Sequence, residues 1–161
     1  MDINAFEQKA ISSLLFTSPV LADDTARFLR TKSKRLSELA QLALSDKVEH
    51  VFWVGAGNSR VNLLSGKELM DRFTPIPSDC FLSYEFIWRN PERLGKKSWV
   101  FLASFSGATE DTVAALRFAK SKGAKTIAFV NQANSLMGNE ADVTIDYDSK
   151  ALYILPLVGF G

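Results

Sequence analysis

Four short apolar runs, with helical periodicity between them, constrain the fold of this 161-residue chain more than any other feature. The runs lie at residues 51–54, 99–103, 126–130 and 143–145. None alternates between apolar and polar residues, a pattern typical of strands buried on both faces of a parallel sheet. Helical candidates between them lie at residues 59–73, 109–122 and 135–140. We therefore expect an α/β fold with a doubly wound, mainly parallel five-stranded sheet.

The first 47 residues have a different pattern and are expected to form a helical segment. Apolar residues recur at helical spacing in residues 3–16 and again in residues 20–45. Ser18 and Pro19 supply a start signal for the second of these helices. We expect this N-terminal segment, residues 1–47, to pack on the α/β domain or on a partner.

The α/β domain is expected to span residues 48–161, and its last part is unusual. Residues 151–161 are almost wholly apolar. An exposed tail of this composition would favour aggregation. Two explanations fit: a partner subunit covers the tail, or the chain is the front part of a longer protein. The second is preferred, so we expect the domain to be truncated at its C-terminus.

Charge and cysteine content exclude several classes of function. The chain has 19 basic and 18 acidic residues, and its formal charge of +1 predicts neither nucleic-acid nor membrane-surface binding. One cysteine and one histidine predict no disulfide framework and no metal site, and we expect no cofactor. The sequence shows no signal peptide and no apolar stretch long enough to cross a membrane, so the expected location is the cytoplasm.

Residues 104–112, Ser-Phe-Ser-Gly-Ala-Thr-Glu-Asp-Thr, lie where a predicted strand turns into a predicted helix. Backbone N–H groups at a helix start are free to bind an anion, and the helix dipole favours negative charge there. The hydroxyls of Ser104, Ser106 and Thr109 could complete the shell of a phosphate monoester. Gly107 would let the backbone approach the ligand closely. A plain helix cap needs only one hydroxyl, so this loop favours phosphate binding over capping alone.

A second loop of the same kind follows the first predicted strand. Gly55 and Gly57 precede Asn58 and Ser59, two residue types common at helix starts. Ligands of open α/β sheets bind at the carboxyl ends of the strands, so adjacent strands would bring both loops together. The three-glycine pattern of dinucleotide sites fails because its third position is Arg60. Helix capping alone is the alternative for this loop.

The charges around the two loops favour recognition over phosphoryl transfer. Glu110 and Asp111 lie in the first helical turn and would repel a phosphate if they pointed inward. The loops lack a lysine, and Arg60 is the nearby cation. Phosphoryl transfer uses a metal or a cationic clamp, so we expect reversible binding of a phosphorylated metabolite instead.

These loops resemble those of the SIS (sugar isomerase) domain family. Residues 104–112 look like the family's signature, and Gly57, Asn58 and Ser59 match its first phosphate-side loop. The resemblance covers about residues 48–147 and is nearest to the N-terminal half of two-SIS enzymes. Those enzymes include fructosamine-6-phosphate deglycases and the isomerase domain of glucosamine-6-phosphate synthase. The resemblance implies a flavodoxin-like fold. It also implies that four hydroxyls contact a sugar phosphate, those of Ser59, Ser104, Ser106 and Thr109.

Catalytic residues are not evident in the sequence. Isomerisation needs a group, usually a carboxylate, to move a proton between neighbouring carbons, and often a histidine to open the sugar ring. Glu85 is a candidate, because residues 83–86 resemble the segment after the second strand of two-SIS enzymes. A carboxylate that satisfies a helix start is an equal alternative for it. His50 precedes the first predicted strand, at the edge opposite the loops, and is expected to be structural or on the surface.

We therefore expect a sugar-phosphate-binding SIS domain from an aldose–ketose isomerase or deglycase acting on an amino-sugar or fructosamine phosphate. The expected partner is a second copy, in a dimer or larger homo-oligomer, or a second SIS domain. Two alternatives stay open: a sugar-phosphate sensor without catalysis, and a single-SIS phosphosugar isomerase. The balanced charge of residues 1–49 argues against a sensor with a DNA-binding segment, and the scarcity of histidine argues against the isomerase.

Overall fold

The computed structural model describes residues 3–149, with the side chains of residues 22–149. This stretch divides into two compact units, residues 3–34 with 148–149, and residues 35–147. The second unit holds the whole sheet and both predicted loops. The expectations for the apolar tail at residues 151–161 lie outside the described residues.

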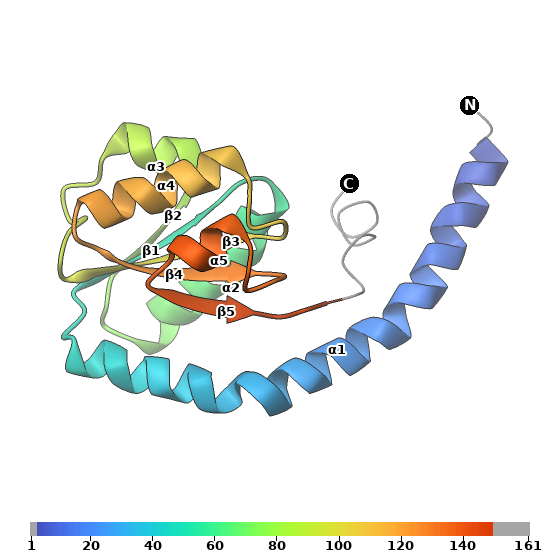
Figure 1. The fold of residues 1–161 in the computed structure, drawn as a ribbon, viewed down its shortest axis with the longest axis horizontal. Coiled ribbons are helices and arrows are strands. Elements are labelled where there is room, and N and C mark those ends of the chain that lie inside the picture. Colours follow the sequence, from blue (N-terminus) through green and yellow to red (C-terminus); the bar gives the residue numbers. More distant parts are fainter. Residues whose placement is uncertain (1–2, 150–161) are drawn as a thin grey trace. The chain divides into compact units, whose positions relative to one another are not determined.

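The sheet has five strands, all parallel, in the order β2-β1-β3-β4-β5 (Figure 1). The strands are β1 His50–Gly55, β2 Ser78–Leu82, β3 Ser98–Ser104, β4 Lys125–Val130 and β5 Val143–Asp146. The chain passes from β1 to β2 on one side and later to β3 on the other, so the strand order reverses at β1. This arrangement confirms the predicted doubly wound α/β fold.

Helices cover both faces of the sheet. In the second unit they are α2 Asn58–Phe73, α3 Ser83–Arg89, α4 Glu110–Ser121 and α5 Leu136–Glu140. Right-handed crossovers place α2 on one face and α3, α4 and α5 on the other (Figure 1). Gly66 of α2 lies against the ring of Trp53. The ring of Phe52 points to the opposite face, where its centroid lies 5.5 Å from that of Phe86 in α3.

An apolar core lies between the sheet and helices α3, α4 and α5. Side chains from the central strands meet the inner faces of these helices. The fully buried members include Val54, Leu102, Leu116, Val130 and Met137. Because this core holds the ends of the central strands, the loops that follow them start from a rigid scaffold.

One predicted helix boundary is wrong. α1 runs from Ile3 to Ser45 as a single helix, whereas the sequence predicts two helices with the second starting at Ser18 and Pro19. A proline inside a helix removes one backbone hydrogen bond and crowds the preceding turn. The remaining hydrogen bonds of a long helix can outweigh that loss, so the local start signal does not end the first helix.

β2 is the strand that the apolar runs do not show. It lies at an edge of the sheet, and most of its side chains are half-buried or exposed. An edge strand faces solvent along one side, so its sequence, Ser-Asp-Cys-Phe-Leu, does not need a continuous apolar run. Strands in the middle of the sheet therefore have longer apolar runs than strands at its edges.

The described residues show neither a membrane span nor a metal cluster. None of the described helices combines the length and the hydropathy that crossing a membrane would require. Among the same residues, no group of three or more His, Cys, Asp or Glu side chains is placed to hold a metal ion. Cys80 is half-buried and free, and burial raises the pKa of its thiol.

Candidate functional site

The loop between β3 and α4 gathers three hydroxyls at one point. Oγ of Ser104, the last residue of β3, lies 2.8 Å from Oγ1 of Thr109 and 3.4 Å from Oγ of Ser106. Ser104 is buried, whereas Thr109 is half-buried and Ser106 is exposed. The three hydroxyls therefore form one cluster that extends from the sheet toward solvent.

Two of these hydroxyls also hold the backbone of the loop. Oγ of Ser104 accepts a hydrogen bond from N of Gly107 at 3.1 Å, and Oγ of Ser106 accepts one from N of Ala108 at 3.2 Å. A hydroxyl that accepts a hydrogen bond keeps its own proton to donate. The two contacts between hydroxyls use two of the three hydroxyl protons, so one proton of the cluster is left to donate to an anionic ligand in this arrangement.

Gly107 has no room for a side chain. Its φ is +63°, and a Cβ atom built on it would lie 2.1 Å from Oγ of Ser135. The carbonyl oxygen of Gly107 accepts a hydrogen bond from N of Met137 at 2.8 Å. The loop is thus held against the first turn of α5, a contact that the sequence does not predict.

α4 begins directly at the hydroxyl cluster. Thr109 is its N-cap residue, and the Thr109 hydroxyl caps no helix N–H but contacts Ser104 instead. N of Thr112 donates a hydrogen bond to O of Thr109 at 3.0 Å, so the N–H groups of Glu110 and Asp111 and the helix dipole are available to an anion beside the cluster. Glu110 and Asp111 occupy the same turn and are exposed, so water screens their charge.

The loop between β1 and α2 contains two glycines with different roles. A Cβ atom on Gly55 would lie 2.9 Å from N of Arg60, so the end of β1 passes very close to α2. Gly57 has a φ of +51° and is the N-cap residue of α2. A Cβ atom built on Gly57 would have no neighbour within 4 Å. An open space therefore lies beside the start of α2, where Asn58 and Ser59 are half-buried.

The two loops are neighbours at the carboxyl edge of the sheet. β1 and β3 pair in parallel, with Gly55 opposite Ala103. Both loops therefore leave the sheet at the same level, beside the point of reversal where ligands of such sheets bind. The structure brings the two loops to one place, as expected, while phosphate binding by their hydroxyls stays a prediction.

Arg60, the cation expected near the loops, lies in the first turn of α2. Its Nε is buried and has no hydrogen-bond partner among the described residues. Burial raises the pKa of Cys80 on β2, and the nearby charge of Arg60 opposes part of that rise. Arg60 therefore lies on the β2 side of the loop, near Cys80, and its unpartnered Nε is buried there.

The carboxylate of Glu85 contacts a residue of α3 and the residue just before that helix. Its Oε2 accepts a hydrogen bond from N of Leu82 at 3.4 Å, and its Oε1 lies 2.8 Å from Nε of Arg89. These contacts agree with the alternative of a carboxylate that satisfies a helix start. Both carboxylate oxygens are thereby occupied in this structure.

His50 lies at the amino end of β1, at the edge opposite the two loops. The side chain is buried, and its Nε2 lies 2.9 Å from Oδ2 of Asp79. The His50 ring also packs against Phe52, with the ring centroids 4.5 Å apart. Packing and one polar contact hold His50 in place, in agreement with the structural role expected for it, while its buried Nδ1 has no hydrogen-bond partner among the described residues.

Two polar residues belong to the carboxyl edge although no motif marks them. Asn131 follows β4 and Tyr147 follows β5. N of Asn131 donates a hydrogen bond to O of Phe105 at 3.2 Å, and the ring centroids of Tyr147 and Phe105 lie 6.5 Å apart. Burial raises the pKa of Tyr147 to about 12, so its hydroxyl is neutral. Their position directly after a buried strand is the signal that could have identified both.

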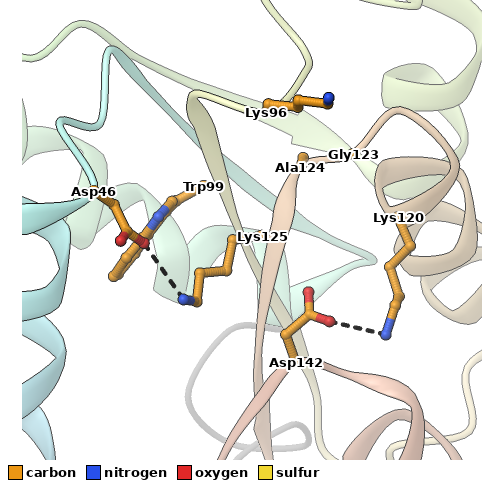
Figure 2. Close-up of a pocket in the computed structure, with 8 residues that line it drawn as sticks. All are labelled: Asp46, Lys96, Trp99, Lys120, Gly123, Ala124, Lys125 and Asp142. Atoms are coloured by element: carbon orange, nitrogen blue, oxygen red, sulfur yellow. Dashed lines mark hydrogen bonds and ion pairs between the residues drawn. The ribbon is translucent and has the colours of Figure 1, made fainter.

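A hollow of about 670 Å³ lies at the opposite, amino edge of the sheet (Figure 2). Lys125 lies 3.4 Å from Asp46, and Lys120 lies 3.0 Å from Asp142. Nζ of Lys125 also lies 5.5 Å from the ring centroid of Trp99. Most charged groups in this hollow therefore have partners within the protein, whereas the hydroxyls and helix starts meet at the carboxyl edge. We place the candidate site at the carboxyl edge.

Two curated relatives illustrate the similarity to known proteins. The chain is 43% identical over 102 residues to fructosamine deglycase FrlB of Bacillus subtilis. That alignment covers 63% of this chain and 31% of the relative. It is 36% identical over 97 residues to an isomerising glutamine–fructose-6-phosphate aminotransferase of Caldanaerobacter subterraneus. That alignment covers 60% of this chain and 16% of the relative. The chain thus spans less than a third of the length of either relative.

A solved structure and a family model agree with these relatives. A candidate phosphosugar isomerase from Bacillus subtilis matches with a TM-score of 0.63 and 38% identity, over 68% of this chain and 35% of that one. The SIS domain model matches residues 43–158, well over half of the chain. The parallel sheet and the two loops at its carboxyl edge therefore belong to a protein of the SIS domain family.

Proposed function

We propose that the two loops at the carboxyl edge bind the phosphate group of a phosphorylated sugar or amino sugar. The observation that carries this proposal is the cluster of Ser104, Ser106 and Thr109 at the start of α4. Hydroxyl and amide donors can surround a phosphate, and the start of α4 adds the positive end of the helix dipole. Ser59, at the start of α2, extends the set of donors from the neighbouring loop.

The relatives suggest which sugar phosphates to test. One is a fructosamine deglycase and another is an isomerising glutamine–fructose-6-phosphate aminotransferase. We infer that the ligand is an amino-sugar or fructosamine phosphate, and that the chain acts as the N-terminal half of such a deglycase or isomerase. Glu85 is bonded in its helix and His50 lies at the other edge. We therefore assign proton transfer to a second SIS half or to a partner subunit.

Calorimetric titration of the 161-residue chain tests the binding site. The ligands are fructose 6-phosphate, glucosamine 6-phosphate and a fructosamine 6-phosphate. Ser104→Ala and Ser106→Ala each remove one hydrogen bond to a charged group, which costs about 1.5–3 kcal/mol, so affinity should fall roughly ten- to a hundredfold. Ser121→Ala, at the far end of α4, is the matched control and should bind like the wild type. Unchanged affinity in both loop variants would remove this loop from the site.

Turnover assays with the same sugars test the assignment of catalysis. We expect the 161-residue chain to bind sugar phosphate and to turn over none of the three by itself. Robust deglycase or isomerase activity of this chain would contradict the assignment of proton transfer to another half or subunit. The occupied carboxylate of Glu85 also suits a second candidate, a sugar-phosphate sensor. A gel-shift assay with genomic DNA distinguishes a DNA-binding sensor from a metabolic enzyme.

A further inference from the structure

A pair of buried hydroxyls joins the start of α3 to the start of α4. Oγ of Ser83, the first residue of α3, lies 2.9 Å from Oγ1 of Thr112, in the first turn of α4. Ser83 is 1% exposed and Thr112 is 0% exposed. Neither hydroxyl has another hydrogen-bond partner among the described residues. Because a buried hydroxyl without a partner is costly, each of the two depends on the other.

This contact connects two strands that are not neighbours in the sheet. α3 follows β2 and α4 follows β3, whereas β1 lies between these two strands. Adjacent strands lie about 4.8 Å apart, so β2 and β3 are separated by roughly 10 Å. Gly55, the last residue of β1, lies opposite Leu82 on one side and Ala103 on the other. The contact between Ser83 and Thr112 therefore bridges the elements that flank the end of β1, on the face covered by α3 and α4 (Figure 1).

α3 and α4 also meet through an apolar contact, farther from the candidate site. The ring of Phe86 in α3 meets the ring of Phe118 in α4 edge-on, with the ring centroids 5.9 Å apart. Phe118 lies nearly two turns beyond Thr112. Apolar contacts hold surfaces together without a preferred direction, whereas a hydrogen bond requires a defined geometry. The hydroxyl pair is therefore the contact that sets the orientation of the first turn of α4 against α3.

We propose that Ser83 and Thr112 are positioning residues for anion binding at the start of α4. Thr112 directly follows Glu110 and Asp111, whose N–H groups face no acceptor in the helix. N of Thr112 also donates to O of Thr109 at 3.0 Å, so the residue that carries one hydroxyl of the cluster is tied to Thr112. The pair thus fixes the direction of these donors before a ligand arrives, and preorganised donors bind more tightly.

Calorimetric titration with glucosamine 6-phosphate tests this role, which rests on the proposed function. Thr112→Val keeps the shape of the side chain and removes its hydroxyl, so affinity should fall about tenfold, the lower end of the effect of supporting hydrogen bonds in metal sites. Thr112→Ser keeps the hydroxyl and should retain affinity. Thr126→Val is the matched control, because Thr126 is also 0% exposed but bonds to Asp142 at the amino edge. It should bind like the wild type.

A double variant separates positioning from stability. Thr112→Val alone leaves the Ser83 hydroxyl buried without a partner, so this variant should unfold at a lower urea concentration than the wild type. Ser83→Ala combined with Thr112→Val removes both hydroxyls and should recover part of that loss. Affinity should stay as low as in Thr112→Val, because no directional contact remains. A double variant that regains affinity together with stability would overturn the positioning role.

Amide hydrogen exchange without any ligand distinguishes a failure of this proposal from a failure of the proposed function. N of Val113 donates to O of Thr109 at 2.9 Å, so the protection of this amide reports the order of the first turn of α4. Protection at Val113 should fall in Thr112→Val and stay unchanged in Thr126→Val. If the wild type binds no sugar phosphate but protection falls as expected, the proposed function fails and the pair still positions the start of α4. Unchanged protection in Thr112→Val would overturn the proposal.

Discussion

The carboxyl edge of the sheet carries hydroxyls and glycines, whereas the amino edge carries ion pairs. At the carboxyl edge, the hydroxyls of Ser104 and Thr109 lie 2.8 Å apart at the start of a helix. At the amino edge, Lys120 pairs with Asp142 beside the hollow that Figure 2 shows, and His50 is bonded to Asp79. One edge therefore offers neutral donors to a ligand, while the charges at the other edge are used within the protein.

Helix direction explains the difference between the edges. In a parallel sheet with helical crossovers, helices begin at the carboxyl edge and end at the amino edge. The positive ends of the helix dipoles gather at the carboxyl edge, so an anion can bind there without a buried lysine. Lys120, in the last turn of α4, complements the negative end of that helix. Under the proposed function, anion binding uses the starts of these helices, whereas ion pairs such as that of Lys120 stabilise their ends.

Gly107→Ala should have the largest effect, because it disrupts the carboxyl edge. The new Cβ would lie 2.1 Å from Oγ of Ser135, in a backbone with a φ of +63°. Strain and overpacking together should lower the free energy of unfolding by about 2–4 kcal/mol, measured by urea unfolding. Gly95→Ala at the amino edge is the matched control, because its Cβ would meet only one atom, at 3.9 Å. Equal losses in both variants would contradict the tight contact at Gly107.

Asp142→Asn should have an intermediate effect, on stability alone. Burial by itself would raise the pKa of Asp142, but hydrogen bonds from Thr126 and Lys120 outweigh burial and lower it. The side chain is 35% exposed, so solvent screens part of this interaction and the loss at neutral pH should be about 1 kcal/mol. Calorimetric titration should show unchanged sugar-phosphate affinity, because the residue lies at the other edge.

The pH dependence of this variant has a definite sign. A carboxylate with a lowered pKa in the folded state stabilises the protein above its unfolded pKa, and this contribution disappears as the pH falls through the folded pKa. The wild type should therefore lose stability as the pH falls below the ordinary aspartate value of 3.8, and Asp142→Asn should lose less. Identical acid unfolding curves for the two proteins, recorded by circular dichroism, would refute this role of Asp142.

Glu110→Gln should have the smallest effect, an increase in affinity for sugar phosphate. Glu110 lies in the first turn of α4, where a negative charge competes with a bound phosphate for the helix dipole. Removing this charge should make the binding free energy of sugar phosphate more favourable by about 0.3–1 kcal/mol, which raises affinity roughly two- to fivefold at low salt. The gain should shrink at high salt, where such charges are screened. Glu92→Gln, an exposed position away from the loops, should leave affinity unchanged.

The sequence predicts the central strands better than the edges and ends of the fold. β1, β3 and β4 coincide with apolar runs, because burial on both faces leaves little room for polar residues. The two edge strands differ: β5 coincides with a short run in which buried and half-buried residues alternate, whereas β2 has no such run. α1 continues through Pro19, where a local start signal predicts a second helix. Patterns over a few residues thus mispredict an element where solvent exposure, as at β2, or a longer helix, as at α1, determines the secondary structure.

The candidate site shows the same division. The position of Ser104 at the end of a buried strand, and of Thr109 at a helix start, is enough to expect their hydroxyls side by side. The sequence leaves a catalytic role and a helix-start role open for Glu85, and only the structure shows that its oxygens contact N of Leu82 and Nε of Arg89, in agreement with the helix-start role. Asn131 and Tyr147 lie outside the signature, and their position directly after a predicted strand is the only sequence signal that places them at the same edge.

The sequence by itself specifies the parallel sheet, the turn from strand to helix at each loop, and the uncharged hydroxyl groups at those turns. These features depend on neighbouring residues and on the general rule that a buried strand must be apolar. Only packing in three dimensions decides that Gly107 has no space beside Ser135, and that Ser65, Leu69 and Phe73 stay exposed on α2. Those outcomes depend on how helices distant in the sequence lie on the sheet, a relation that no single segment encodes.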